Sequence, residues 1–283
     1  MRGIVTIACG PEKYLRWAAG LARSLEIHYP DCPRHLITDR PDHPTARLFG
    51  TCSSLRPEEN GMVAKLRLDD LSPYSETLFV DADSVVFRGL DPVFDRLGVQ
   101  PFSVTGYSIT EGHWYADVKE LLRRIDRCAL PKFNSGLLYF RKEKKAQEVF
   151  RLAREIFVHY GEYRIADPQG RPADEPCFAI AMALAGIEAI PDDGTLMRTP
   201  IGMKGRLLAD PVCGICRLNS DGQIIEPAIL HYVSLTKHRS YASCRFKLHL
   251  KGLPLLHPAV RNVCAEVLAY LWSGAGKAGF FER

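Results

Sequence analysis

The first residues of the chain alternate between short apolar segments and an amphipathic one, and this alternation strongly restricts the fold. Residues 3–10, "GIVTIACG", form an apolar run that ends in glycine, as a buried strand followed by a loop would. Residues 11–29 place their apolar side chains on one helical face, and residues 33–39, "PRHLITD", indicate a second strand that ends at Asp39. Strand, helix and strand in this order predict a parallel βαβ unit, and nucleotides favour the carboxyl ends of such strands.

The rest of the chain continues as helices and strands. Helical patterns cover residues 61–71, 90–97, 116–126, 142–160, 173–186 and 258–272. Strand patterns cover residues 75–87, 100–107, 133–142 and 224–233. We therefore predict an α/β fold with a mixed, mainly parallel sheet flanked by helices in residues 1–240. A basic, amphipathic helical appendage follows in residues 241–283.

Two carboxylates interrupt the apolar strand segment "SETLFVDADSVVF" at residues 75–87. If the whole segment is extended, Asp81 and Asp83 point to the same side, with Ala82 between them. Ionised carboxylates this close repel each other unless a cation bridges them, and oxygen ligands of this kind suit Mg²⁺ or Mn²⁺. The alternative interpretation is that one aspartate caps a turn while the other is solvated.

Composition narrows the class of protein. Apolar and charged fractions of 46% and 25% are ordinary for a globular domain. The longest apolar stretch, residues 177–187, is shorter than the ~20 residues that span a bilayer, so we expect no transmembrane segment. "MRGIVTIACG" lacks the long apolar region of a signal peptide, and nine cysteines spread along the chain indicate reduced thiols. These features predict a cytoplasmic protein.

The net charge of +4 is unevenly distributed. Residues 231–265 contain no Asp or Glu and carry +6, which leaves −2 (+4 minus +6) for the rest of the chain. The six cations are Lys237, Arg239, Arg245, Lys247, Lys251 and Arg261. This block indicates an anionic partner, either a membrane contacted peripherally through residues 237–251 or a nucleic acid, because Tyr241 and Phe246 alternate with the charges. A solvated basic face is the remaining alternative.

Several motifs in a fixed order resemble a known family. Lys65 on a helix precedes the apolar strand with its Asp-X-Asp pair, and "LDPVFD" follows at residues 90–95. "FNSGLLYF" at residues 133–140 and "HYVSLTK" at residues 231–237 complete the set. Together they are similar to the GT-A nucleotide-sugar transferases, most closely glycosyltransferase family 8, which includes glycogenin and bacterial lipopolysaccharide galactosyltransferases. The resemblance runs from about residue 3 to residue 240.

The resemblance assigns roles to matching residues. The metal ligands, for Mn²⁺ or Mg²⁺, would be Asp81, Asp83 and His231. The catalytic residues would be Asn134, Asp174, Glu175 and Lys237. Of these, Lys237 would contact the diphosphate. The nucleotide-sugar contacts would be Ala8, Cys9, Gly10, Tyr14, Asp39, Lys65, Ala82, Ser135, Gly136 and Ser234.

Ordinary structural roles compete with some of these assignments. Lys65 is alternatively a solvated surface residue, and Asp39 a turn residue. Tyr14 and His231 are alternatively core residues. Asp174 is alternatively the N-cap of its helix.

The chain also departs from the family pattern. Ser234 replaces a glycine, and "KHRSY" at residues 237–241 replaces Lys-Pro-Trp, which puts the acceptor side in doubt. Glu175 stands where the family has a glutamine after the aspartate, and we predict that it faces the anomeric centre or the acceptor hydroxyl.

The leading hypothesis is a metal-dependent hexosyltransferase that uses a nucleotide-diphosphate sugar, UDP-linked, and retains configuration. Its partners would be this donor and an acceptor that the sequence does not identify. One alternative is a sugar nucleotidyltransferase, but "CGPEKY" at residues 9–14 lacks the Gly- and Arg-rich loop expected there. The other is a nucleic-acid or membrane-surface binder on a degenerate GT-A fold, which leaves the aspartate pair, Asn134 and His231 unexplained.

Overall fold

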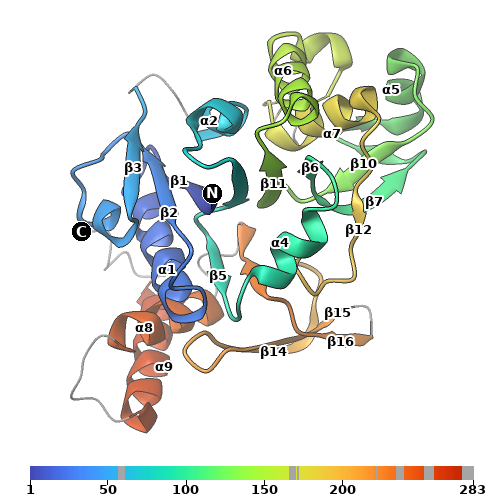
Figure 1. Ribbon diagram of the computed structural model, residues 1–283. Coiled ribbons are helices and arrows are strands. Elements are labelled where there is room, and N and C mark those ends of the chain that lie inside the picture. The colour runs from blue at the N-terminus through green and yellow to red at the C-terminus, as the bar shows by residue number, and fades with distance from the viewer. Residues whose placement is uncertain are drawn as a thin grey trace. The chain divides into compact units, whose positions relative to one another are not determined.

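The computed structural model describes residues 1–56, 61–165, 170, 172–220, 222–233, 239–251 and 258–275. These residues form two compact units, each built from separate segments of the chain. The first unit comprises Met1–Glu12, Cys32–Asp81 and Pro92–Asp193, and the second Lys13–Asp31, Ala82–Asp91 and the described residues from Gly194 onward. The predicted division at residue 240 does not coincide with these units and stays a prediction. Figure 1 labels most of the helices and strands.

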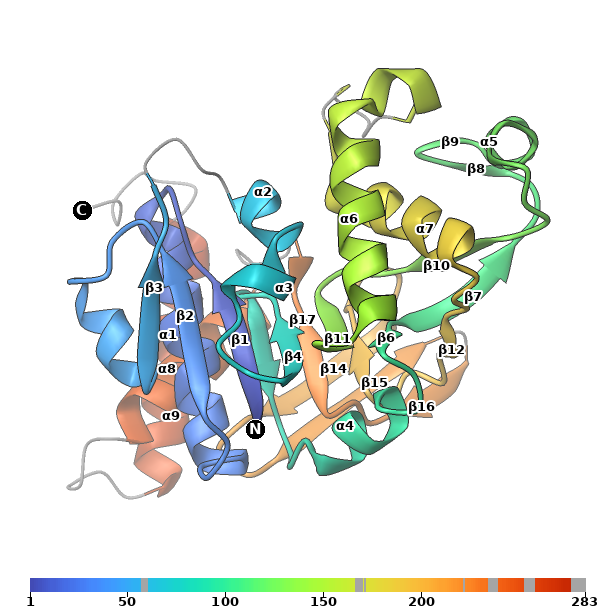
Figure 2. The same cartoon turned by 45° about the horizontal axis from the view of Figure 1, so that its top comes forward.

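A six-stranded sheet forms the centre of the first unit. Its strands are β1 (Arg2–Ile7), β2 (Arg34–Thr38), β3 (Thr51–Ser54), β4 (Glu76–Val80), β6 (Phe102–Ser103) and β11 (Leu137–Arg141). Their order is β3-β2-β1-β4-β11-β6, and Figure 2 shows β3, β2, β1 and β4 side by side. These four are parallel, whereas β11 pairs antiparallel with both β4 and β6. The predicted mixed, mainly parallel sheet is therefore confirmed, with α1 (Glu12–His28) connecting β1 to β2.

Smaller elements complete the first unit. Its other strands are β7 (Thr105–Ile109), β8 (His113–Trp114), β9 (Ala116–Asp117), β10 (Leu130–Phe133) and β12 (Ile190–Pro191). Its helices are η1 (Pro44–Leu48), α2 (Gly61–Lys65), α3 (Leu68–Leu71), α4 (Asp91–Leu97), α5 (Val118–Ile125), α6 (Lys144–Val158), η2 (Tyr160–Tyr163) and α7 (Asp174–Ala185). The single helix predicted over residues 61–71 is thus two short helices. Leu66 and Leu68 are both buried, and two residues on one helix at that spacing point in opposite directions.

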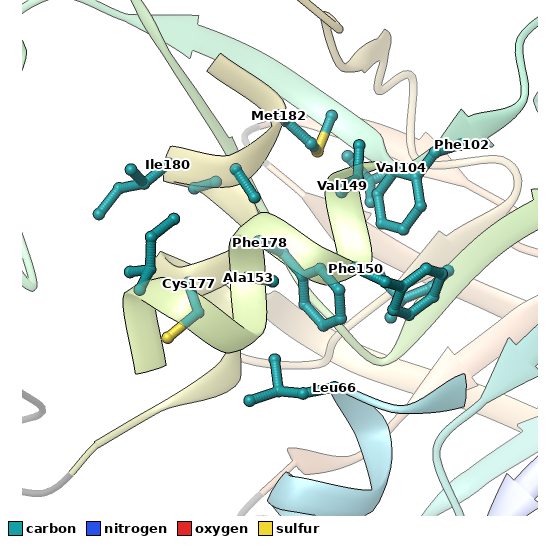
Figure 3. Close-up of a cluster of buried hydrophobic side chains, with 14 of the residues drawn as sticks. Leu66, Phe102, Val104, Val149, Phe150, Ala153, Cys177, Phe178, Ile180 and Met182 are labelled. Atoms are coloured by element: carbon teal, nitrogen blue, oxygen red, sulfur yellow. The ribbon is translucent and has the colours of Figure 1, made fainter. Parts of the chain in front are cut away.

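The core of the first unit lies between its sheet and the helices α6 and α7. Phe178 of α7 stacks on Phe102 with ring centroids 5.6 Å apart and meets Phe150 of α6 edge-on at 5.5 Å. Figure 3 shows these three rings together with Leu66 from the segment after α2. Nearly every residue of α7 is buried, as its apolar sequence predicts, so the start of this helix is held firmly in place.

The segment "SETLFVDADSVVF" is two strands rather than one. β4 ends at Val80, a turn occupies Ala82 and Asp83, and β5 (Ser84–Val86) joins a different sheet. The expectation that Asp81 and Asp83 lie on one extended strand is therefore wrong, although ligand oxygens of the two side chains still lie within 4.8 Å of each other. The apolar residues on both sides are buried in different units, because the chain leaves the central sheet at this point.

The second unit contains two three-stranded sheets and three helices. In one sheet, β17 (Ile229–His231) lies between β13 (Met197–Arg198) and β5. In the other sheet, β15 (Ile215–Ser220) lies between β14 (Lys204–Asp210) and β16 (Gln223–Ile225). The helices are α1, α8 (Arg239–Lys251) and α9 (Pro258–Ala275). Among the described residues, no helix combines the length and apolar composition needed to cross a membrane.

Candidate active site

A buried lysine lies among the carboxylates of the first unit. Lys65 is the last residue of α2 and is only 6% exposed. Its Nζ lies 2.8 Å from Asp174 Oδ2 and 3.4 Å from Asp81 Oδ2. It also donates to Ser135 Oγ at 3.1 Å and lies 4.8 Å from the centroid of the Phe79 ring. The alternative of a solvated surface lysine is wrong, and Lys65 links three predicted site residues.

Mutual attraction sets the protonation of this centre. Burial alone would lower the pKa of Lys65, but the Asp174 and Asp81 carboxylates outweigh it and hold that pKa above its ordinary value. Burial alone would likewise raise the pKa of Asp174, but Lys65 and a hydrogen bond from Ser135 hold it below its ordinary value. Lys65 is therefore an ammonium and Asp174 a carboxylate at neutral pH.

The turn before β11 brings the predicted sugar-pocket residues to this lysine. Asn134 Oδ1 accepts the Gly136 N–H at 2.9 Å, which closes a local side-chain-to-backbone turn. The Asp81 N–H in turn donates to the Gly136 carbonyl at 2.9 Å. Ser135, between Asn134 and Gly136, is buried, and its hydroxyl oxygen accepts a hydrogen bond from Lys65 Nζ. The end of β4 and the turn before β11 are thus joined at Asp81.

Glu175 has hydrogen bonds on both carboxylate oxygens. Oε1 accepts the Ser135 N–H and Oε2 accepts the Tyr115 hydroxyl, each at 3.0 Å. Burial raises the pKa of Glu175, and the neighbouring Asp174 carboxylate adds to this rise. A role at the anomeric centre or the acceptor hydroxyl stays a prediction, but the two protein donors favour a role in positioning Ser135.

The start of α7 carries the predicted acid pair. The helix begins at Asp174, its capping position is Ala173, and no side chain caps it. Because the Asp174 carboxylate pairs with Lys65, the alternative that Asp174 is the N-cap is wrong. Asp174 and Glu175 still lie in the first turn, where the positive end of the helix dipole stabilises negative charge.

Asp83 and His231 form a buried pair of a carboxylate and an imidazole in the second unit. β17 pairs antiparallel with β5 so that His231 lies opposite Ser84, the residue after Asp83. Asp83 Oδ1 lies 3.0 Å from His231 Nε2, and the two side chains are 12% and 6% exposed. The Tyr232 N–H donates to the Asp83 carbonyl at 3.1 Å and holds the strand ends in register.

Asp81, Asp83 and His231 are a group that could hold a metal ion. Asp81 is two positions before Asp83 in the chain. Two carboxylates with one imidazole form a set of ligands that suits a divalent ion such as Mn²⁺. The hydroxyls of Ser84 and Tyr241 are buried and have no hydrogen-bond partner among the described residues. Burial and the Asp83 charge both raise the pKa of Tyr241. Since buried polar groups rarely lack partners, these two hydroxyls fit a site completed by an ion and its ligands.

The loop after β1, which contains the predicted base contacts Ala8, Cys9 and Gly10, is tied to the end of β2. The Ala8 N–H donates to the Ile37 carbonyl and the Gly10 N–H to Asp39 Oδ2, each at 2.9 Å. Gly10 has a φ of +86°, a backbone conformation that favours glycine. Asp39 Oδ1 accepts no hydrogen bond in the described part of the chain but lies 3.8 Å from Arg40 Nε, so the contact with base or ribose stays a prediction.

The remaining predicted residues are not brought to these centres by any observed contact. The Tyr14 ring packs edge-on against Trp17 with centroids 5.0 Å apart, so its role as a stacking platform stays a prediction. Ala82 is buried in the turn before β5. Ser234 and Lys237 lie outside the described residues.

Part of the basic block faces the interior of the second unit. Tyr241 is 1% exposed, and Lys247 is 8% exposed with its Nζ 3.3 Å from Asp210. Arg239 and Lys247 each lie 3.5 Å from Glu266 of α9. The expected surface on which aromatic and basic side chains alternate is therefore wrong for Tyr241 and Lys247. Aromatic and basic residues alternate in this segment because α8 turns one of its faces inward. The predicted contact of residues 237–251 with a membrane is therefore left without support.

Tyr115 is the site residue that sequence reasoning missed. It lies between β8 and β9 with a φ of +59°, which is rare for a residue other than glycine, and it contacts Glu175. No motif marks it. The available signal is "EGHWYAD" at residues 111–117, which places two aromatic residues in a turn-rich stretch. Strained backbone of this kind often accompanies function, but the strain is visible only in the structure.

Comparison with known proteins supports the fold. No protein-family model and no curated protein matches the chain. A crystal structure of the galactosyltransferase LgtC with donor and acceptor sugar analogs is 17% identical with a TM-score of 0.54, covering 97% of this chain and 96% of that chain. An active-site mutant of LgtC, in which glutamate replaces glutamine, has the same identity and TM-score and covers 82% and 87%. The resemblance to GT-A glycosyltransferases inferred from the motifs is thus confirmed at the level of fold.

Proposed function

We propose that the protein is a metal-dependent glycosyltransferase. It would transfer a hexose from a nucleotide-diphosphate sugar, UDP-linked, to an acceptor with retention of configuration. The observation that carries the proposal is the contact of Asp83 with His231, two positions after Asp81 at the carboxyl end of the central strand β4. In open α/β sheets this end of the strands is where ligands bind. The cytoplasmic location inferred from the cysteines belongs to the same proposal.

The proposed metal ligands are Asp81, Asp83 and His231, with Mn²⁺ or Mg²⁺ as the ion. When bound, the ion offsets the negative charge that develops on the leaving diphosphate. The contact between Asp83 and His231 orients both side chains before any ion binds. Lys237 is proposed to add a second positive charge at the diphosphate.

The proposed donor-sugar pocket is organised around Lys65. Its ammonium holds the Asp174 carboxylate and the Ser135 hydroxyl in fixed positions. Asp174 and Asn134 would then accept hydrogen bonds from sugar hydroxyls, and Gly136 would allow close approach of the sugar to the backbone.

The retaining step can follow two routes. A covalent route needs a carboxylate oxygen free to attack the anomeric carbon, whereas same-face attack needs only a pocket that aligns donor and acceptor. Because both Glu175 oxygens accept hydrogen bonds from Ser135 and Tyr115, we favour same-face attack.

The proposed nucleotide contacts lie on the loops after β1 and β2. Asp39 would bind the base or ribose through Oδ1, while its Oδ2 holds the Gly10 N–H. Ala8 and Cys9 would line the same edge, with Tyr14 as the stacking residue. A nucleotidyltransferase would need a Gly- and Arg-rich loop in this place. A plain binding protein would leave the buried pair of Lys65 and Asp174 without a role.

Release of UDP from UDP-sugars tests the proposal. The protein is incubated with UDP-glucose, UDP-galactose or their N-acetyl forms and Mn²⁺, and free UDP is measured with and without EDTA. We expect slow, Mn²⁺-dependent hydrolysis that EDTA abolishes and that added Mn²⁺ restores. Full release in the presence of EDTA contradicts the metal assignment. Absence of UDP release from all of these UDP-sugars contradicts the proposed transfer from a UDP-linked donor.

A further inference from the structure

A cluster of arginines in the second unit has no part in the proposed reaction. On α1, Arg16 lies four residues before Gly20 and Arg23 three residues after it, so all three share one helical face. Arg245 of α8 meets α1 at Gly20, where an added Cβ would lie 3.4 Å from Arg245 Cγ. The glycine thus leaves room for the Arg245 side chain between the two arginines of α1.

The positive charges of this cluster act on one another. Burial lowers the pKa of Arg245, and the charges of Arg16 and Arg23 lower it further. His249, one turn further along α8, has its pKa lowered by burial and then by Arg23 and Arg245. The Arg245 guanidinium lies 5.8 Å from the centroid of the Tyr241 ring, a contact that restricts its orientation.

The two faces of α8 differ in how their cations are compensated. Arg239 and Lys247 contact carboxylates, as described above. Arg16, Arg23 and Arg245, by contrast, make no ion pair and no hydrogen bond within the part of the chain that the structure describes. Three guanidinium groups that repel one another are stabilised when an anion binds among them.

We propose that Arg16, Arg23 and Arg245 bind a phosphate group of an anionic ligand. The N–H groups of a guanidinium match the spacing of phosphate oxygens, and such charge-assisted bonds are short and strong. Arg16 is exposed, whereas Arg23 and Arg245 are half-buried, so the donors can be reached from solvent and yet are partly shielded from it. The phosphate is carried by a soluble phosphorylated compound or by a phospholipid headgroup. Neither source depends on the transferase activity proposed above.

Titration with inorganic phosphate at constant ionic strength tests the site. The Nε–Hε signals of the arginines are followed by NMR in the wild type and in the double variant Arg16→Gln/Arg23→Gln. We expect saturable shifts of the Arg16, Arg23 and Arg245 signals in the wild type. In the double variant the Kd, followed on Arg245, should rise about tenfold or more, as the loss of a charge-assisted hydrogen bond implies. The variant Arg245→Lys, which keeps the charge, should weaken binding less.

The matched control is Arg47→Gln/Arg123→Gln, which removes the same charge at two exposed arginines of the first unit. We expect it to bind phosphate like the wild type. If the control weakens binding as much as Arg16→Gln/Arg23→Gln does, or if chloride at equal ionic strength causes the same shifts, the proposal is overturned.

A second arm identifies the source of the phosphate. Each protein is sedimented with vesicles of phosphatidylcholine, alone or mixed with phosphatidylglycerol. Binding to the anionic vesicles that disappears in Arg16→Gln/Arg23→Gln, but not in the control, supports the site and assigns it to a headgroup. Saturable phosphate binding without vesicle binding supports the site and assigns it to a soluble compound.

Discussion

The two units compensate their buried aspartates in different ways. In the first unit, Asp174 faces the permanent charge of Lys65 at 2.8 Å. In the second, Asp83 faces His231 at 3.0 Å, a side chain whose charge depends on pH and which is also a common metal ligand. The hydroxyls of Ser84 and Tyr241 also lack partners in the described chain. The comparison indicates that a permanent positive charge compensates Asp174, whereas the partner of Asp83 is a residue type that itself binds metal ions.

Replacing the lysine should have the largest effect on stability. Lys65→Met leaves the Asp174 carboxylate buried without its cation, so we expect the free energy of unfolding to fall by about 3–5 kcal/mol. Urea unfolding measures this loss. Lys142→Met, at an exposed lysine, should change stability by no more than about 0.5 kcal/mol. Lys65→Met/Asp174→Asn should recover part of the loss, and a Lys65→Met protein as stable as the wild type would show that the centre does not depend on the ammonium.

Replacing the second aspartate should instead affect activity. Asp83→Asn keeps the shape of the side chain but removes a proposed metal ligand, so we expect Mn²⁺-dependent UDP release to fall about 100-fold or more. The melting temperature should stay close to that of the wild type. Asp31→Asn, at an exposed aspartate of the same unit, is the control and should keep full activity. Full activity of Asp83→Asn would remove the distinction drawn between the two centres.

A smaller effect is expected for Glu175→Gln. A glutamine can accept the Ser135 N–H through its oxygen and donate to the Tyr115 oxygen through its amide, so both contacts survive. We therefore expect turnover to fall by less than about tenfold, whereas Glu175→Leu, which loses both contacts, should fall further and raise KM for the donor. A fall of several hundredfold in Glu175→Gln with unchanged UDP binding would restore the role at the anomeric centre that the sequence suggested.

The smallest effect concerns pH. Burial raises the pKa of Glu175 in the folded protein, so this side chain favours the folded state most below its unfolded pKa of about 4.3. That contribution is lost as pH rises through the folded pKa and is constant above it. The stability of the wild type relative to Glu175→Gln should thus decline with rising pH, by at most about 1.4 kcal/mol per pH unit. Urea unfolding between pH 4 and 8 measures the difference, and a difference independent of pH contradicts the raised pKa.

Sequence patterns predicted the regular parts of the molecule well. The apolar runs at β1, β2 and β4 and the apolar helix α7 were all recognised, because periodic burial is written directly into the order of side chains. The motif spacing also selected Lys65, Asp174 and Ser135, which the structure brings together. The sequence predicts one helix where the structure has α2 and α3, and a basic surface where α8 turns one face inward. The periodicity of these segments does not reveal which neighbouring elements cover them.

The sequence by itself determined the type of fold and the residue types of the candidate site. Strand, helix and strand order restricts the topology, and carboxylates within an apolar segment require compensation wherever they lie. Only the tertiary structure decided which cation compensates each of them. Lys65 is 109 positions from Asp174 (174 minus 65), and His231 is 148 positions from Asp83 (231 minus 83), and both pairs are in contact. The placement of Arg245 on Gly20 was decided in the same way. Spacing in sequence carries no information on such contacts, because they form only when packing of the cores brings distant segments together.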